Sequence, residues 1–313
     1  MSAVSENKPS FARFLTVNDP SKQWIADRIS GLMDSSTVVP SLSIAAVKLS
    51  NAVKGDGADM DEVSRIISMD PGLTMRCLKV ASSSAYSYGS VDSIDQAVMM
   101  IGMRQIRNIA FTVGVVDGFQ KLRIHVDWRR FWLHSILVGR LTEVVASVFR
   151  EPIGFEYISG LLHDVGNLVI EHDFPREFES IMLEAMERRC GHDVLERRKL
   201  GIDHTQIGAA LCDNMKLGKD TIYGVRYHHD PLNPRSIERP LGDEGFLACC
   251  IALADTLTGI ADVNLDRFKD YSSDFQDLPE WQHLSRWQML APLEIDMKKQ
   301  IEKAEGDLAA MGC

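Results

Sequence analysis

Residues 161–167 read Leu-Leu-His-Asp-Val-Gly-Asn and place a histidine beside an aspartate within an otherwise apolar, helical pattern. A carboxylate that leaves water needs a paired charge, hydrogen bonds or a bound cation. His163 and Asp164 both belong to residue types that bind metals. On this stretch alone, a metal site competes evenly with a capped or salt-bridged Asp164 beside a core histidine.

Helical periodicity extends along the chain on both sides of this stretch. Apolar residues recur at intervals of three to four, which predicts amphipathic helices. Asp70-Pro71 and Ser93 are typical helix starts, because Asp and Ser accept hydrogen bonds from first-turn amides and proline suits the first helical position. Strand-like alternation is hard to find. The sequence therefore predicts an all-α fold, with clear helices over residues 104–116, 128–149, 204–215, 221–229 and 244–260.

Composition is that of a globular protein. The 313 residues are 45% hydrophobic and 25% charged, and the formal net charge is −10. This charge argues against a broad nucleic-acid-binding face. The first residues lack an apolar signal segment, no stretch is apolar enough to span a membrane, and none of the six cysteines forms a C-x-x-C pair. We expect a cytoplasmic protein with no membrane or nucleic-acid partner.

Five histidines and two aspartates lie in apolar helical settings. Taken singly, each has a simple explanation as a core residue, a helix cap or a histidine near a helix C-terminus. Taken together they need a common partner, and imidazole with carboxylate suits iron, manganese, zinc or nickel. A bridging aspartate can hold two ions about 3.5–4 Å apart, which suits phosphodiester hydrolysis. The candidate ligands are His134, His163, Asp164, His204, His228, His229 and Asp255.

The order of these residues resembles the HD superfamily of metal-dependent phosphohydrolases, in particular the two-metal pattern of HD-GYP cyclic-dinucleotide phosphodiesterases. The first half is similar to the HDOD domain, an all-helical relative usually regarded as a signalling module. The resemblance covers roughly residues 30–262 and implies a multi-helix HD-like bundle with an N-terminal helical subdomain. It is weaker at Ser83, where the family typically has Asn. The matching motifs are Val39-Pro40-Ser41-Leu42, residues 66–74, Ser83-Ser84-Ala85-Tyr86, Ile94-Asp95-Gln96-Ala97 and Ile101-Gly102.

The resemblance also implies a division of the ligands. His134, His163, Asp164 and Asp255 would surround one ion, and Asp164 would bridge to a second ion held by His204, His228 and His229. Iron or manganese is favoured, with zinc or nickel as alternatives. Asp164 and Asn167 are the candidate catalytic residues, although HD-GYP enzymes carry Lys where Asn167 stands. No GYP signature follows His229, and Arg140 or Lys199 would be the source of added positive charge.

Four parts of the chain are expected. Residues 1–20 are polar and predict a flexible tail. Residues 21–120 would form the N-terminal helical part of the HDOD domain, and residues 121–262 its HD-like metal-site part. Residues 263–313 would combine an irregular segment over 264–285 with an amphipathic helix within 292–311.

Three functions stay open. The first is a regulatory HDOD protein that keeps a dinuclear metal site and acts on signalling protein partners. The second is an active metal-dependent phosphohydrolase, with a nucleotide or cyclic dinucleotide as ligand. The third is a metal-free helical protein-interaction module. A homodimer is compatible with each of these functions.

Overall fold

A computed structural model of the chain describes residues 10–34, 48–49, 60–83, 85–86, 89–120, 122–152, 154–232, 245–260 and 275–311. Every regular element in these ranges is helical, which confirms the all-α prediction. Two parts of the HDOD-like pattern, Val39–Leu42 and Ser84, lie outside the described residues, as do residues 1–9 of the predicted tail. None of the described helices has the length and apolar character needed to cross a bilayer.

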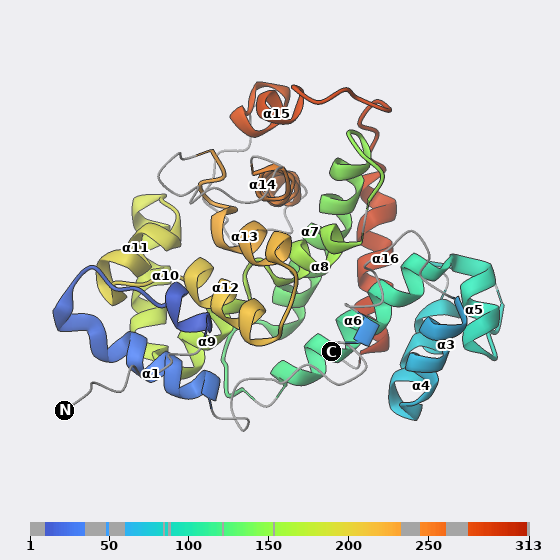
Figure 1. The fold of residues 1–313 in the computed structure, drawn as a ribbon, viewed down its shortest axis with the longest axis horizontal. Coiled ribbons are helices and arrows are strands. Elements are labelled where there is room, and N and C mark those ends of the chain that lie inside the picture. Colours follow the sequence, from blue (N-terminus) through green and yellow to red (C-terminus); the bar gives the residue numbers. More distant parts are fainter. Residues whose placement is uncertain are drawn as a thin grey trace, which may run out of the picture.

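The helices form two groups joined by long central helices (Figure 1). The N-terminal elements η1 (Ser10–Phe14), η2 (Pro20–Lys22) and α1 (Gln23–Asp34) lie beside the second group. The first group comprises α3 (Met60–Ser68), α4 (Pro71–Ala81), α5 (Ile94–Ile101) and α6 (Met103–Phe119). The second comprises α7 (Trp128–Ser147), α8 (Phe155–Leu162), α9 (Val165–Asp173), α10 (Pro175–Arg188), α11 (His192–Leu200), α12 (His204–Asn214), α13 (Lys219–Tyr227) and α14 (Phe246–Ile260). The chain continues through η3 (Phe275–Asp277), α15 (Pro279–Leu284) and α16 (Met297–Ala310).

The predicted helix starts are confirmed. One oxygen of Asp70 accepts hydrogen bonds from the amides of Gly72 and Leu73 at 2.9 and 3.1 Å, and Pro71 occupies the first turn of α4. Ser93 caps α5 in the same way. These caps satisfy amides that the helix itself leaves without partners.

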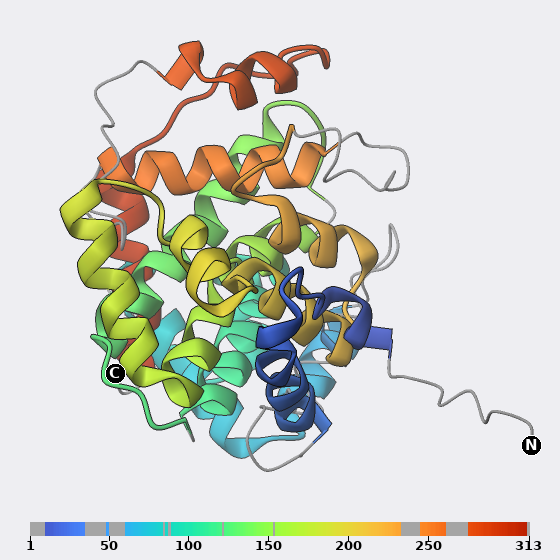
Figure 2. The ribbon, with the colours of Figure 1, turned by 90° about the vertical axis from the view of Figure 1, so that its left-hand side faces the viewer.

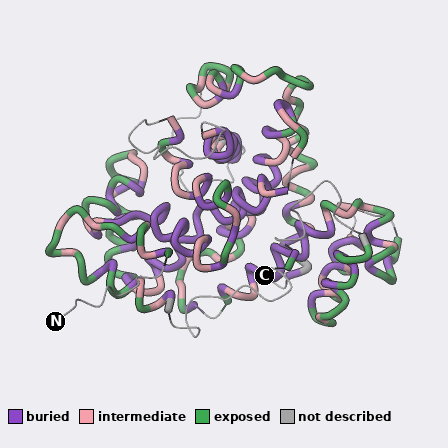
Figure 3. Tube along the Cα trace, in the orientation of Figure 1, coloured by how far each residue is buried: buried purple, intermediate pink, exposed green. Residues whose placement is uncertain are grey.

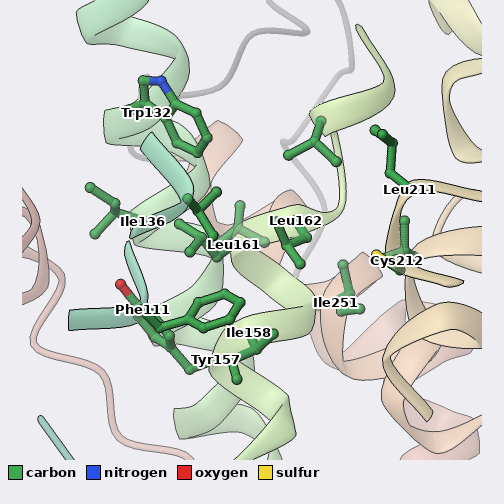
Figure 4. Close-up of a cluster of buried hydrophobic side chains, with 14 of the residues drawn as sticks. Phe111, Trp132, Ile136, Tyr157, Ile158, Leu161, Leu162, Leu211, Cys212 and Ile251 are labelled. Atoms are coloured by element: carbon green, nitrogen blue, oxygen red, sulfur yellow. The ribbon is translucent and has the colours of Figure 1, made fainter. Parts of the chain in front are cut away.

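The core is densest around α7, which packs against α8, α14 and α16. Large apolar side chains from α6, α7 and α8 interlock there, among them Phe111, Trp132 and Tyr157 (Figure 4). A Cβ atom added to Gly160 of α8 would lie 2.7 Å from the Cα of Gly139 and 2.6 Å from Thr142 Oγ1. The two helices can therefore cross this closely only because both positions are glycine, and this crossing brings His134 beside His163.

The extent to which each helix is buried depends on its place in this arrangement. The central segments of α7, α8, α12 and α14 are almost wholly buried, whereas α3, α4 and α5 alternate between buried and exposed positions (Figure 3). The C-terminal helix α16 packs against both α7 and α4, and so ties the two groups together. The turned view in Figure 2 shows α14 crossing above the bundle, with the segment that contains α15 above it.

Two expectations about irregular segments are corrected. Residues 10–20 are not a loose tail: Phe11 and Leu15 are buried, η1 packs on α12, and Arg13 pairs with Asp213 at 3.0 Å. Part of the segment expected to be irregular, residues 275–284, forms η3 and α15. Trp281 is buried there, and α15 packs on α14. In both segments, the apolar side chains pack against helices that are remote in sequence.

The boundary at residue 21 is also revised. Helix α1 packs against α12, which belongs to the second group of helices. Residues 23–34 therefore lie with the expected metal-site part rather than with α3–α6. Their Arg28 side chain confirms this placement, because it binds Asp173 at the end of α9.

Candidate metal centre

All seven candidate ligands converge on one region, although they come from five different parts of the chain. His134 projects from α7, and Asp255 lies in the middle of α14. His163 and Asp164 form the junction between α8 and α9. His204 begins α12, and the pair His228-His229 follows α13. All are buried except His229, which is partly exposed.

Asp164 lies at the centre of the cluster. Its Oδ2 atom is 3.3 Å from His163 Nε2 and 3.8 Å from His134 Nε2. Its Oδ1 atom is 3.3 Å from His204 Nε2 and 3.7 Å from His228 Nε2. The two carboxylate oxygens thus face two separate pairs of histidines.

The remaining two residues complete one group each. Asp255 Oδ1 is 3.4 Å from His134 Nε2, and His229 Nε2 is 3.0 Å from His204 Nε2. The ligand atoms of Asp164, His204, His228 and His229 lie within 4.8 Å of one another, as do those of His134, His163 and Asp164. Atoms at this spacing could be ligands of one metal ion.

The outer nitrogens of two of the imidazole rings are held by the backbone. His163 Nδ1 contacts the carbonyl oxygen of Gly160 at 2.8 Å, and His228 Nδ1 contacts that of Val225 at 2.8 Å. A carbonyl only accepts, so each Nδ1 carries the proton and each Nε2 presents a lone pair to the centre. This orientation is the one that metal-binding histidines adopt.

The charge distribution favours an ionised Asp164. Burial opposes its ionisation, but the neighbouring His163, His204 and His228 outweigh burial and hold the pKa of Asp164 well below its ordinary value. Burial lowers the pKa of His228 well below its ordinary value. Asp164 is therefore an anion and His228 a neutral imidazole at neutral pH, as metal binding requires.

A close approach of two helix starts places His204 against this carboxylate. A Cβ atom added to Gly166, in the first turn of α9, would lie 2.0 Å from the carbonyl oxygen of His204. Only glycine therefore allows the start of α12 to come this near to Asp164. The capping box formed by Asp203 and Gln206 fixes the same turn.

Two further residues of the site were not predicted from the sequence. Glu196 of α11 accepts from the His204 amide at 2.8 Å and contacts His204 Nδ1 at 2.7 Å. His192 stacks on the His204 ring, with centroids 4.7 Å apart. His192, Glu196 and His204 also have ligand atoms within 4.8 Å of one another. The available signal was the spacing of four between His192 and Glu196, which puts both on one face of a helix.

Of the other candidate residues, Asn167 lies at the cluster, whereas Arg140 and Lys199 do not. Asn167 is buried at the edge of the cluster, and its Nδ2 atom lies 3.4 Å from His192 Nε2. The suggestion that Arg140 or Lys199 supplies positive charge to the site is wrong. Arg140 pairs with Asp307 at 3.3 Å, and Lys199 binds Ser180 and Glu184 at 2.7 and 2.9 Å. Both cations contact carboxylates on helix faces away from the cluster.

Comparisons with known proteins give the family. The HDOD domain model matches residues 39–231. A crystal structure of an HDOD domain protein from Geobacter sulfurreducens is 24% identical and covers 93% of this chain and 95% of its own, with a TM-score of 0.72. A Marinobacter aquaeolei protein, provisionally described as a signal transduction protein, is 20% identical and covers 96% of this chain and 69% of its own, with a TM-score of 0.70.

Among curated proteins, an uncharacterized protein of Treponema pallidum is 25% identical over 209 residues, which are 66% of this chain and 39% of that protein. The chain thus spans well under half the length of this relative. The residues matched by the HDOD model include six of the seven candidate ligands, and Asp255 lies beyond them. Because this match extends over more than half of the residues, from before α3 to the end of the histidine cluster, the chain belongs to the HDOD family.

Proposed function

We propose that this protein is a regulatory HDOD protein that holds two divalent metal ions, with Asp164 as the bridging ligand. One observation carries the proposal: the two oxygens of a single buried carboxylate face different pairs of imidazole nitrogens. A carboxylate that served only as an ion-pair partner would need to face only one of these pairs of imidazoles.

The polar atoms at the centre support this reading. Within the described part of the chain, Asp164 Oδ1 and His228 Nε2 are buried and have no hydrogen-bond partner. Leaving such atoms unsatisfied costs about 1–3 kcal/mol each. Both are good ligand atoms for iron or manganese, and zinc or nickel would fit the same donors.

The residues divide between two ions as follows. His134, His163 and Asp255 would hold the first, His204, His228 and His229 the second, and Asp164 would bind both. Bound metal would supply Lewis acidity and lower the pKa of a bound water molecule. We infer that the state of this centre is read by signalling protein partners, in keeping with the signal-transduction description of the Marinobacter protein of similar fold.

A second candidate function is phosphohydrolase activity on a nucleotide or cyclic dinucleotide. The partial exposure of His229 favours it, because one side of the cluster is thereby open to a small molecule. Asp164 would hold the ions, and Asn167 would donate a hydrogen bond to a phosphate oxygen. Hydrolysis of bis(p-nitrophenyl) phosphate by metal-loaded protein, and its loss in Asp164→Ala, would establish this activity; an inactive but metal-loaded protein would leave the regulatory function.

Elemental analysis of protein purified without added metal and without a histidine tag tests the metal centre. We expect about two equivalents of iron or manganese per chain. Asp164→Ala should lose both ions, because the bridge contributes to each site. The matched control is His125→Ala, which removes an exposed histidine outside the cluster. Full metal content in Asp164→Ala would exclude the bridge, and no uptake by the unaltered chain under anaerobic reconstitution would leave a metal-free interaction module.

A further inference from the structure

A cavity separate from the histidine cluster lies where the start of α6 meets α7 and α16. Its volume is about 500 Å³, within the range of small-molecule sites. The turn Ile101–Met103 forms one wall, and side chains of α7 and α16 form the others. None of the seven candidate metal ligands lines it.

The charged residues that line this cavity are mostly cations. Arg104, Arg140 and Lys303 all line it, whereas Glu143 is the one carboxylate among the lining residues. Arg104 is only loosely engaged by Glu143, with Nε and Oε1 3.5 Å apart. In a protein with a net charge of −10, a converging set of cations is an unusual local feature.

Arg140 is the fixed part of this set. Its side chain is 6% exposed, and one terminal nitrogen binds Tyr86 and lies 3.3 Å from Asp307. The other contacts Gln105 Oε1 at 3.4 Å. The Nε atom is buried and has no hydrogen-bond partner within the described residues. The guanidinium is therefore held in place with donor capacity left over.

Lys303 is brought close to Arg140 by α16. Its Nζ lies 5.3 Å from the Tyr86 ring centroid, and the guanidinium of Arg140 lies 5.6 Å from the same centroid. Burial, with the charges of Arg140 and Lys299, lowers the pKa of Lys303. Asp307 lies beside both cations and offsets part of their charge. The three cations Arg104, Arg140 and Lys303 still outnumber the two carboxylates Glu143 and Asp307, so the cavity favours an added anion.

The backbone adds to the positive potential. Gly102, with φ of 86°, ends α5 and begins α6, and no side chain caps the amides of the first turn of α6. Free amides at the start of a helix of 17 residues attract phosphate groups. The remaining walls include Met103, Val144 and Pro152, which suit an apolar or ring-shaped part of a ligand.

We propose that this cavity binds a small phosphorylated organic molecule, about the size of a nucleoside monophosphate, through Arg104, Arg140, Lys303 and the first-turn amides of α6. The phosphate would lie against the cations, and the organic part against the apolar walls. This site is separate from the metal centre and does not depend on the function proposed for it.

Calorimetric titration of the EDTA-treated 313-residue chain tests the site, with AMP, ribose 5-phosphate and inorganic phosphate as probes. We expect AMP or ribose 5-phosphate to bind more tightly than inorganic phosphate. Arg104→Gln and Lys303→Gln should each weaken this binding about tenfold, because each removes a charge-assisted contact. Both side chains are at least partly exposed, so the variants should keep the thermal stability of the unaltered protein.

Two controls separate this site from other sources of binding. Lys298→Gln removes an 89% exposed lysine of the same helix and should leave AMP binding unchanged. Asp164→Ala disables the metal centre and should also leave AMP binding unchanged. The proposal is overturned if neither organic phosphate binds, if inorganic phosphate binds as tightly, if Arg104→Gln and Lys303→Gln have no effect, or if Asp164→Ala abolishes binding.

Discussion

The His204 ring lies between two carboxylates, Asp164 on its Nε2 side and Glu196 on its Nδ1 side. Burial opposes protonation of this ring, but Glu196 and Asp164 outweigh burial and raise the pKa of His204. A carboxylate that accepts the outer proton of a metal-binding histidine orients the ring and makes it a stronger ligand. Glu196 is thus a positioning residue for the ion that we assign to His204.

We predict that Glu196→Gln weakens metal binding at one of the two positions. The amide keeps the shape of the side chain but removes its charge, and loss of such partners typically costs about 10–100-fold in metal affinity. Competition with a chelator should therefore remove one equivalent of metal from the variant at a lower chelator concentration. Glu187→Gln, on an exposed position of α10, is the control. Equal resistance of both ions to the chelator would contradict this role.

The candidate ligands could be predicted because a histidine or aspartate within an apolar helix is conspicuous. Asp255 stands out in this way between Ala254 and Leu257. His192 and Glu196 could not be found by the same rule. Their helix carries Arg197, Arg198 and Lys199 in its last turn and therefore has the composition of a solvent-exposed helix. Its burial comes from α10 and α12, which the local sequence does not show.

At the scale of elements, the crossing of α7 and α8 determines where His134 and His163 meet. We predict that Gly160→Ala destabilises the protein by about 1–3 kcal/mol or more, because the added methyl group meets backbone atoms of α7 as well as the Thr142 hydroxyl. Urea denaturation would measure the change. Metal content should fall as well, since separating the helices separates the two imidazoles.

Gly31→Ala provides the matched control for this prediction. Gly31 lies in α1, and a Cβ atom added there meets nothing within 4 Å. Alanine is the better helix former by about 1 kcal/mol, so this variant should be neutral or slightly stabilising. Equal destabilisation by the two variants would show that the glycine crossing has no special role.

Most helices were predictable from periodicity and caps, but short elements were not. The strong signals at Asp70 and Ser93 correspond to real helix starts. η1 has only five residues, too few for a periodic pattern. Its position depends on contacts such as Ser10 with Asp213, which are separated by 203 residues. The residues next to η1 in the sequence do not indicate which distant residues it contacts.

At the scale of the whole molecule, Asp307 links α16 to both groups of helices. It accepts a hydrogen bond from the Tyr86 hydroxyl at 2.8 Å and pairs with Arg140. Burial raises the pKa of Asp307 to about 6, against the opposing charges of Arg140 and Lys303. The folded protein thus holds this proton more tightly than the unfolded chain, where the carboxyl has an ordinary pKa near 3.8.

This difference in the pKa of Asp307 makes the folded protein less stable as the pH rises. The stabilisation from the protonated carboxyl is complete below about pH 4 and is lost as the pH rises through about 6. Asp307→Asn removes this titration. The free energy of unfolding of the variant, relative to the unaltered protein, should therefore rise between pH 4 and pH 7, by up to about 3 kcal/mol. Urea denaturation at both pH values would measure it, and a constant difference would contradict the prediction.

The packing of α16 on α4 has a consequence for biosynthesis. Lys79 of α4 binds the carbonyl oxygen of Ala309, which follows it by 230 residues. At about 5–20 residues per second, a ribosome delivers that partner roughly 10–50 seconds later. During this interval, the apolar side chains that α16 covers on α4 and α7 are open to water and to other nascent chains. Chaperones that hold such surfaces should therefore bind growing chains that have not yet reached α16, and release them once α16 has emerged and docked.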